Sequence, residues 1–486
     1  MKYGAMREGG GIAGGALDSK RPLEEDEPAQ QAVSRRKRTP GATQEGHLGL
    51  GRGLDASCRR SVLVLTGPTA VGKTATSIAI ATALDGEIIS ADSVQVYRGL
   101  DVGSAKIRRE EMAGIAHHLI DILDPEEEFS AGVFHTLATE LIADIIRRGK
   151  TPIVVGGTGF YLRWLVSGRP NTPVSTKESE ARAREALEGV WEDGMDEGAR
   201  WDAGVALVRR LGDGETADRL DVQERNNWYR MGRVVDILLQ RPGKTLRDLD
   251  RGGEDREGGE GGEGGEGGEG GDFDFRCFFL VRERMELYRR VDHRVELMLG
   301  NKLVTETYER LRKFIRTEGA SDQENQDNQT CASRSIGYRQ VLEALSRWIS
   351  SVDTGVDGGR ASEQHGGAVT EDDIIQLAKD IQSASRQYCH KQMQWFRKEP
   401  AFRWLLVDDE HGDATDGAAR TIIEMFNAPE PPTEPDALKA HRMTKEEERR
   451  MRAYVPELRV LRPGSEALRG VVDEANRVVS LARADL

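Results

Sequence analysis

The sequence is poor in cysteine and in long apolar runs, and each shortage excludes a class of protein. Its four cysteines, Cys58, Cys277, Cys331 and Cys389, stand singly, so the sequence indicates neither a disulfide framework nor a cysteine metal site. The longest apolar runs are strand-sized, far below the roughly 18–20 residues that cross a bilayer. We therefore expect no membrane association and a reducing compartment, the cytoplasm or an organelle.

Aromatic residues are also scarce, at 6% of 486 residues, whereas 31% are charged and 55 are glycine. This balance predicts disordered stretches around a folded core. The formal net charge of −14 argues against a protein that coats nucleic acid uniformly. Residues 222–247 and residues 382–404 nevertheless each carry a net charge of +4, so we expect local positive surfaces.

Short apolar segments alternate with helical stretches in the first half of the chain. Residues 61–65, 87–90 and 152–155 have the pattern of buried strands, and residues 74–84 and 130–148 that of helices. This alternation predicts a doubly wound parallel α/β sheet. Helical periodicity is also expected over residues 177–250, 278–315, 336–350 and 371–398.

These patterns divide the chain into six parts. Residues 251–272 contain a Gly-Gly-Glu repeat. The repeat cannot bury enough apolar surface to offset its ordering entropy, so it predicts a flexible loop. Three tryptophans are the expected packing anchors of the helical insertion: Trp191, Trp201 and Trp228. The expected parts are a disordered leader (1–58), a P-loop core (59–176), a helical insertion (177–250), the flexible loop (251–272), a helical part of the core (273–410) and a tail without assigned role (411–486).

The strongest single motif is GPTAVGKT, residues 67–74, which fits G-x-x-x-x-G-K-[ST] between a strand and a helix. Glycines let the backbone N–H groups wrap a phosphate chain, and the following helix adds its positive end. Lys73 would contact the outer phosphate, and Thr74 would hold Mg²⁺. The predicted diphosphate-binding residues are Gly67, Pro68, Thr69, Ala70, Val71, Gly72, Lys73 and Thr74.

The position of the nearest acid separates this chain from ordinary P-loop hydrolases. Those enzymes place an acid after a second apolar strand to hold Mg²⁺. Here Gly156, Gly157 and Thr158 follow the strand at 152–155, and the acid is Asp92, after the strand at 87–90. Asp92 could act as a general base, bind a metal, or cap the next turn.

Further motifs occur in a fixed order along residues 60–406: SADSVQVY (90–97), DVGSAK (101–106), HHLIDILDP (117–125), FSA (129–131), GGTGFY (156–161), SIGYRQ (335–340) and RQYCHKQMQWFR (386–397). Together with the P-loop they resemble the tRNA dimethylallyltransferases. The resemblance implies a P-loop NTPase-like sheet with a helical insertion, Mg²⁺ as cofactor, and a monomeric enzyme. It also implies dimethylallyl diphosphate as donor and the tRNA anticodon stem-loop as acceptor.

The resemblance assigns roles to matching residues. Lys73 and Thr74 would bind the diphosphate and Mg²⁺, and Asp92 would take a proton from N6 of the adenosine adjacent to the anticodon. Arg290 would steady the leaving diphosphate, and Thr158 would contact the reacting region. The implied tRNA contacts are Asp92, Ser93, Gln95, Tyr97, Arg182, Arg230, Arg233, Gly337, Tyr338, Arg386, Lys391 and Arg397.

The chain departs from the family in two places. Asn227 stands where an Asp is usual, and no cysteine follows Cys389, so the Cys/His finger of some eukaryotic members is missing. The sequence therefore resembles the bacterial or organelle-derived branch. Trp395 and Phe396 could equally be core aromatics.

Three other functions remain as alternatives. Prenylation of a free adenine nucleotide would not need the insertion or residues 386–397. A P-loop kinase or NTPase would need the acid that is missing after residue 155. A non-catalytic RNA-binding module would not need Lys73, Thr74 and Asp92 together.

Overall fold

The computed structural model describes residues 61–168, 172–173, 175–192, 194–223, 225–251, 273–315, 330–350, 368–407, 414–429, 437–440 and 443–485. The expected leader at 1–58 and the Gly-Gly-Glu repeat lie outside these ranges.

A six-stranded parallel sheet forms the centre of the core, in the order β3-β2-β4-β1-β5-β6. In β1, Leu65 pairs with Val155 of β4 on one side and with Phe278 of β5 on the other. Such central strands are apolar on both faces because helices cover both. The strands are β1 (Ser61–Thr66), β2 (Gly86–Ser90), β3 (His117–His118), β4 (Thr151–Val155), β5 (Asp274–Val281) and β6 (Phe402–Leu406).

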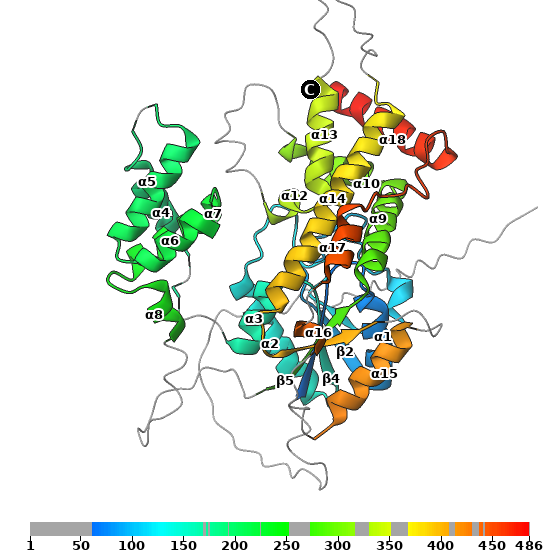
Figure 1. The fold of residues 1–486 in the computed structure, drawn as a ribbon, viewed down its shortest axis with the longest axis horizontal. Helices are drawn as coiled ribbons and strands as arrows, with labels where there is room; N and C mark the ends of the chain where they lie inside the picture. The colour runs from blue at the N-terminus through cyan, green and yellow to red at the C-terminus, as the bar shows by residue number, and fades with distance from the viewer. Residues whose placement is uncertain are drawn as a thin grey trace, which may run out of the picture. The chain divides into compact units, whose positions relative to one another are not determined.

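Helices cover both faces of this sheet. Connections that run in opposite directions along a parallel sheet place their helices on opposite faces, because each crossover is right-handed. Figure 1 shows α1 and α15 on one side of the strands and α2 and α3 on the other. The core helices are α1 (Lys73–Ala83), η3 (Arg109–Met112), α2 (Ala131–Arg147), α3 (Gly159–Ser167), α9 (Arg284–Gly300), α10 (Leu303–Leu311), η5 (Arg312–Phe314), α12 (Cys331–Arg334), α13 (Tyr338–Ser350) and α14 (Glu371–Phe396).

The expected doubly wound parallel sheet is confirmed, and it has more strands than the sequence patterns indicated. The helix predicted over 278–315 is wrong at its start, because residues 274–281 form β5 in the sheet. Phe278 and Phe279 are buried there beside β1. The helix α9 begins only at Arg284, where the Glu283 side chain caps it by accepting a hydrogen bond from the Glu286 amide. Strands β3 and β6 were not predicted.

The insertion is helical, as predicted, and has a hydrophobic cluster of its own. Trp201 is fully buried in this cluster, and Trp228 packs against it, with ring centroids 5.0 Å from Trp201 and 5.8 Å from Trp191. Asn227 caps α7 by accepting from the Arg230 amide at 3.1 Å, a role that Asp and Asn fill equally well. Its helices are α4 (Lys177–Glu188), α5 (Glu197–Arg210), α6 (Gly214–Gln223), α7 (Trp228–Gln240) and α8 (Leu246–Arg251).

Most of the described residues after 411 are helical, and α15, α18 and Leu461 contribute to the core cluster. Helix α18 buries Val471, Val478 and Val479 and packs against α9, α10, α13 and α14. We use "the C-terminal segment" for residues 443–485. The helices in this part are α15 (Ala414–Asn427), α16 (Ala437–Ala440), α17 (Lys445–Arg452) and α18 (Glu466–Asp485).

Candidate active site

The P-loop connects β1 to α1 at the carboxyl edge of the sheet, next to the end of β4. Gly67 and Gly72 have φ angles of 151° and 113°, which favour glycine. A Cβ at Gly67 would lie 2.7 Å from the Leu280 carbonyl oxygen, so this position also lacks space for a side chain. Lys73 Nζ donates to the carbonyl oxygens of Gly67 and Pro68 at 2.9 and 3.0 Å. The carbonyl oxygens of the loop therefore hold the Lys73 ammonium group within the P-loop.

The electrostatics of Lys73 fit a phosphate-binding site. Burial lowers its pKa to about 8, and the nearby Arg294 acts in the same direction, while Asp92 opposes them. Positive charge is thus concentrated and only partly compensated. A polyphosphate anion would relieve this repulsion.

Asp92 follows β2 and both caps a turn and faces the site. Its Oδ1 accepts from the amides of Val94 and Gln95, at 2.9 and 3.3 Å. The capping role that the sequence allowed is thus present. The carboxylate also lines the same cavity as Lys73 and Thr74, so the turn cap orients it toward the P-loop.

A cavity of about 500 Å³ unites the P-loop with Asp92 and with helices from the second half of the chain. Of the predicted residues it includes Thr69, Ala70, Gly72, Lys73, Thr74, Asp92, Gln95 and Arg290. Sequence reasoning missed Ser104, Ala105, His293, Arg294, Leu297, Tyr388 and Gln392. Parallel strands collect such loops at one edge, which explains why distant motifs meet here.

Two arginines of α9 line this cavity. Arg290 Nε donates to the Ala70 carbonyl oxygen in the P-loop, at 3.2 Å. Arg294, one turn later, donates to the Ser104 carbonyl oxygen, also at 3.2 Å. Burial lowers the pKa of Arg294. Arg294 lies four residues after the predicted site residue Arg290, and such positions share one face of a helix. This spacing could have identified Arg294 from the sequence.

Helix α14 closes the site through Gln392. Its Oε1 accepts from the Thr69 amide at 3.2 Å, and its Nε2 donates to the Gly157 carbonyl oxygen at 3.0 Å. A Cβ at Gly157 would lie 2.5 Å from that nitrogen. One amide side chain thus connects the P-loop to the glycines after β4. The motif at 386–397 contained Gln392, but its spacing did not reveal this contact.

Glu306 holds the loop formed by the DVGSAK motif. Its carboxylate accepts from the amides of Asp101, Val102 and Gly103 at 2.8–3.0 Å, and the Tyr338 hydroxyl donates to it at 2.6 Å. The ring of Tyr338 leaves no room for a Cβ at Gly103. Because the next residues of this loop line the cavity, Glu306 and Tyr338 shape the site from behind it.

Several predicted tRNA contacts are internal in the structure. Tyr97 and Tyr338 are 0% exposed, so neither side chain can contact an RNA from its position. Gly337 has a φ of 98° and donates its amide to Gln340 Oε1 at 2.8 Å, which indicates a turn. Arg386 forms an ion pair with the buried Asp292. These positions support the architecture of the site.

Other predicted residues remain accessible or lie beside the site. Lys391 is exposed, and Ser93 and Arg397 are half-buried. Thr158 stands at the N-cap of α3, and its amide donates to the Ala91 carbonyl oxygen at 3.4 Å, without lining the cavity. Phe396 is a core residue, and the Trp395 ring lies 4.5 Å from that of Phe160.

Within the insertion the arginines predicted to contact tRNA differ in solvent exposure and in hydrogen-bond partners. Arg182 is exposed on α4 and Arg230 is half-buried on α7. Arg233 donates to Ser175 Oγ and Asp236 Oδ2, both at 2.5 Å, so its charge is used inside the insertion.

The described residues contain no group of three or more His, Cys, Asp or Glu side chains that could hold a metal. Thr74, exposed at the first turn of α1, offers one hydroxyl next to the phosphate cradle. This donor set fits Mg²⁺, which retains waters and takes few protein ligands together with phosphate oxygens. His117 and His118 bond to the Ile115 carbonyl oxygen and to Glu87, so their roles are structural.

Comparison with known families agrees with this geometry. The sequence model of the family described as IPP transferase matches residues 95–399. The chain belongs to this family. It is 35% identical over 364 residues to tRNA dimethylallyltransferase 9 of Arabidopsis thaliana, covering 71% of each chain. It is 32% identical to the tRNA dimethylallyltransferase of Protochlamydia amoebophila, covering 72% of this chain and 85% of that protein.

A solved structure extends the likeness to the fold. A eukaryotic dimethylallyltransferase, crystallised in snapshots of its action on tRNA, matches with a TM-score of 0.55 at 24% identity, over 78% of this chain and 83% of that one. This likeness supports the P-loop NTPase-like fold. Among the described residues no helix is both long and apolar enough to cross a membrane.

Proposed function

We propose that the chain transfers a dimethylallyl group from dimethylallyl diphosphate to N6 of the adenosine adjacent to the anticodon in tRNA, releasing diphosphate. One observation carries this proposal: a single cavity joins a P-loop to a carboxylate that follows a different strand, Asp92. Family membership agrees, since relatives named tRNA dimethylallyltransferase match most of the chain.

The chemistry needs a base and a stabilised leaving group. The adenine N6 lone pair is delocalised, so the amine is a poor nucleophile. As N6 attacks the first carbon of the dimethylallyl group, the bond from that carbon to the diphosphate oxygen breaks. The N6 proton passes to Asp92, and the bond electrons leave with the diphosphate.

The leaving charge develops where the cations lie. Lys73 and the N-terminus of α1 would bind the diphosphate, and Arg290 and Arg294 would contact it from α9. When bound through Thr74, Mg²⁺ would supply further neutralisation of the phosphate oxygens. Thr158 lies one residue beyond the cavity lining, so we assign it to positioning of the GGTGFY turn.

The adenine N6 must reach Asp92 inside the cavity, which requires the adenine to leave the anticodon-loop stack. We propose that Ser93, Gln95, Lys391 and Arg397, together with Arg182 and Arg230 in the insertion, contact the RNA. The enzyme would act as a monomer in the cytoplasm or in an organelle. Gel filtration with light scattering, and imaging of the tagged full-length chain, test these two statements.

One experiment separates the alternatives. The protein is incubated with labelled dimethylallyl diphosphate, Mg²⁺ and either tRNA or AMP, and ATP hydrolysis is measured in parallel. Label should enter only tRNA. Label in AMP would favour an adenylate prenyltransferase, and Mg²⁺-dependent ATP hydrolysis would favour an NTPase, which the glycines after β4 argue against. Transfer to a tRNA that carries guanosine at the target position should be absent.

A further inference from the structure

The C-terminal segment lies beyond the family match, which ends at residue 399, yet it satisfies a buried charge of α9. Glu296 is 0% exposed. Its Oε1 accepts from the Arg459 amide at 3.1 Å, and its Oε2 accepts from the amides of Val460 and Leu461 at 2.6 and 2.8 Å. Hydrogen bonds to an ionised acceptor are strong and directional. They fix this segment against one point of the helix.

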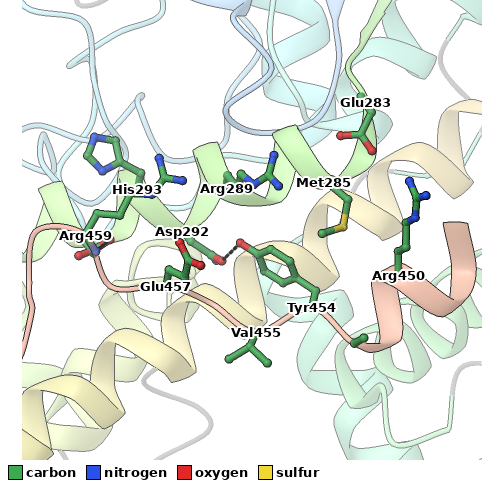
Figure 2. A pocket seen from close by; sticks show the side chains of 12 residues that line it. Glu283, Met285, Arg289, Asp292, His293, Arg450, Tyr454, Val455, Glu457 and Arg459 are labelled. Atoms are coloured by element: carbon green, nitrogen blue, oxygen red, sulfur yellow. Dashed lines mark hydrogen bonds between the residues drawn. The ribbon is translucent and has the colours of Figure 1, made fainter.

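A second buried carboxylate of α9 makes a similar connection. Asp292 is 2% exposed, and its Oδ2 accepts from the Tyr454 hydroxyl at 2.6 Å, while its Oδ1 pairs with Arg386 of α14. Figure 2 shows Tyr454 reaching from the loop after α17 to Asp292. Three distant parts of the chain therefore meet on this face of α9.

Helix geometry relates this face to the active site. Arg290 and Arg294 are four residues apart and share one face, as do Asp292 and Glu296. A shift of two residues turns a helix of 3.6 residues per turn by about 200°, so the two pairs point in opposite directions. A second cavity, of about 770 Å³, lies between α9 and the C-terminal segment (Figure 2). His293 lines both cavities, so they adjoin at this residue of α9.

We propose that the C-terminal segment is a brace that fixes the rotation and the axial position of α9, and so aims Arg290 and Arg294 at the diphosphate. Glu296 and Tyr454 are then positioning residues. This inference rests on the proposed function. A misplacement of about 1 Å at a reacting group can lower a rate on the order of 10²-fold, so a small rotation of α9 is sufficient to matter. Burying two acids is costly unless donors satisfy them, and the segment supplies those donors.

The first test removes one hydroxyl. Tyr454→Phe keeps the ring and deletes the bond to Asp292. We expect the Kd for inorganic diphosphate with Mg²⁺, measured by calorimetry, to rise about threefold to tenfold, within the range of one hydrogen bond to a charged group. The kcat should fall by a similar factor with an unchanged KM for tRNA. Tyr288→Phe is the matched control. Tyr288 lies on α9, and its ring centroid is 5.8 Å from that of Tyr454, so this variant should change neither value.

The decisive test is a double-mutant cycle. In a background that carries both Arg290→Ala and Arg294→Ala, Tyr454→Phe should weaken diphosphate binding less than twofold, because both groups that the brace aims are gone. Glu296→Gln should behave like Tyr454→Phe; if it fails to fold, Tyr454→Phe alone decides. Full multiplication of the two effects, or unchanged diphosphate affinity in Tyr454→Phe, would overturn the inference. Failure of the proposed function would instead appear as no prenyl transfer by the unaltered enzyme.

Discussion

The pH dependence of diphosphate binding offers a direct test of the P-loop lysine. Burial, assisted by Arg294, lowers the pKa of Lys73 to about 8 in the ligand-free protein. A bound anion favours the charged form, so binding must take up a proton wherever the free lysine is neutral. The affinity should therefore be nearly constant below pH 7 and should fall as the pH rises through 8.

The magnitude follows from the population of the binding-competent form. With a pKa of about 8, roughly nine-tenths of the lysine is charged at pH 7 and roughly one-tenth at pH 9. Since the apparent Kd scales inversely with the competent fraction, it should rise about tenfold between these two values. Titration calorimetry with a non-transferable diphosphate analogue measures both the Kd and, in buffers of different ionisation enthalpy, the proton uptake.

A matched variant isolates Lys73. Lys73→Arg keeps a positive charge at all accessible pH values, so it should bind more weakly because its shape differs, but with a flat profile from pH 7 to 9. Two results would refute the reasoning. One is a flat profile in the unaltered protein, and the other is an equal slope in Lys73→Arg, which would place the titrating group elsewhere.

Three further perturbations test other parts of the structure. Asp92→Asn should lower kcat about 10²–10⁴-fold while sparing diphosphate affinity, and retention of a tenth of the activity would assign the base elsewhere. Glu306→Gln should raise KM for dimethylallyl diphosphate about tenfold. Tyr338→Phe removes one of the four hydrogen-bond donors to Glu306 and should have a smaller effect. Equal effects would contradict the conclusion that the Glu306 carboxylate holds the DVGSAK loop. The Glu87 carboxyl has its pKa lowered to about 2, first by hydrogen bonds from Arg148. It should stabilise the fold by up to about 3 kcal/mol above pH 4.5, and urea melts should show this gain lost as pH falls toward 2 and absent at every pH in Glu87→Gln.

The sheet and the position of its ligand edge could be predicted because they depend on local patterns. Short apolar runs between Gly-rich turns identify β1, β2 and β4, and the P-loop adds its own spacing. Strand β5 was misassigned because its apolar residues, Cys277 to Leu280, are contiguous and carry no periodicity. A run of this kind fits a strand or a buried helix equally well until its neighbours are known.

The direction of side chains on the long helices could not be predicted in the same way. Motif matching identified residues 386–397 and assigned all three of the cations Arg386, Lys391 and Arg397 to RNA. In the structure Gln392 connects Thr69 to Gly157, and Arg386 neutralises Asp292. Which face of α14 points inward depends on partners that lie about 100 to 320 positions away along the chain, and no local pattern contains them.

The spacing of the three predicted cations on and beside α14 explains why Lys391 separates from the other two. Residues five and six positions apart on an α-helix differ by about 140° and 240° in direction, so Lys391 points away from both arginines, whereas Arg386 and Arg397, eleven positions apart, lie within about 20° of each other. Their environments agree with this: Arg386 pairs with buried Asp292, Lys391 is exposed, and the Arg397 guanidinium lies 5.7 Å from the Trp404 ring centroid. A single basic stripe on this helix is therefore excluded by geometry. Of these three cations only Lys391 is exposed, so we expect recognition of tRNA to draw on more than one element of the chain.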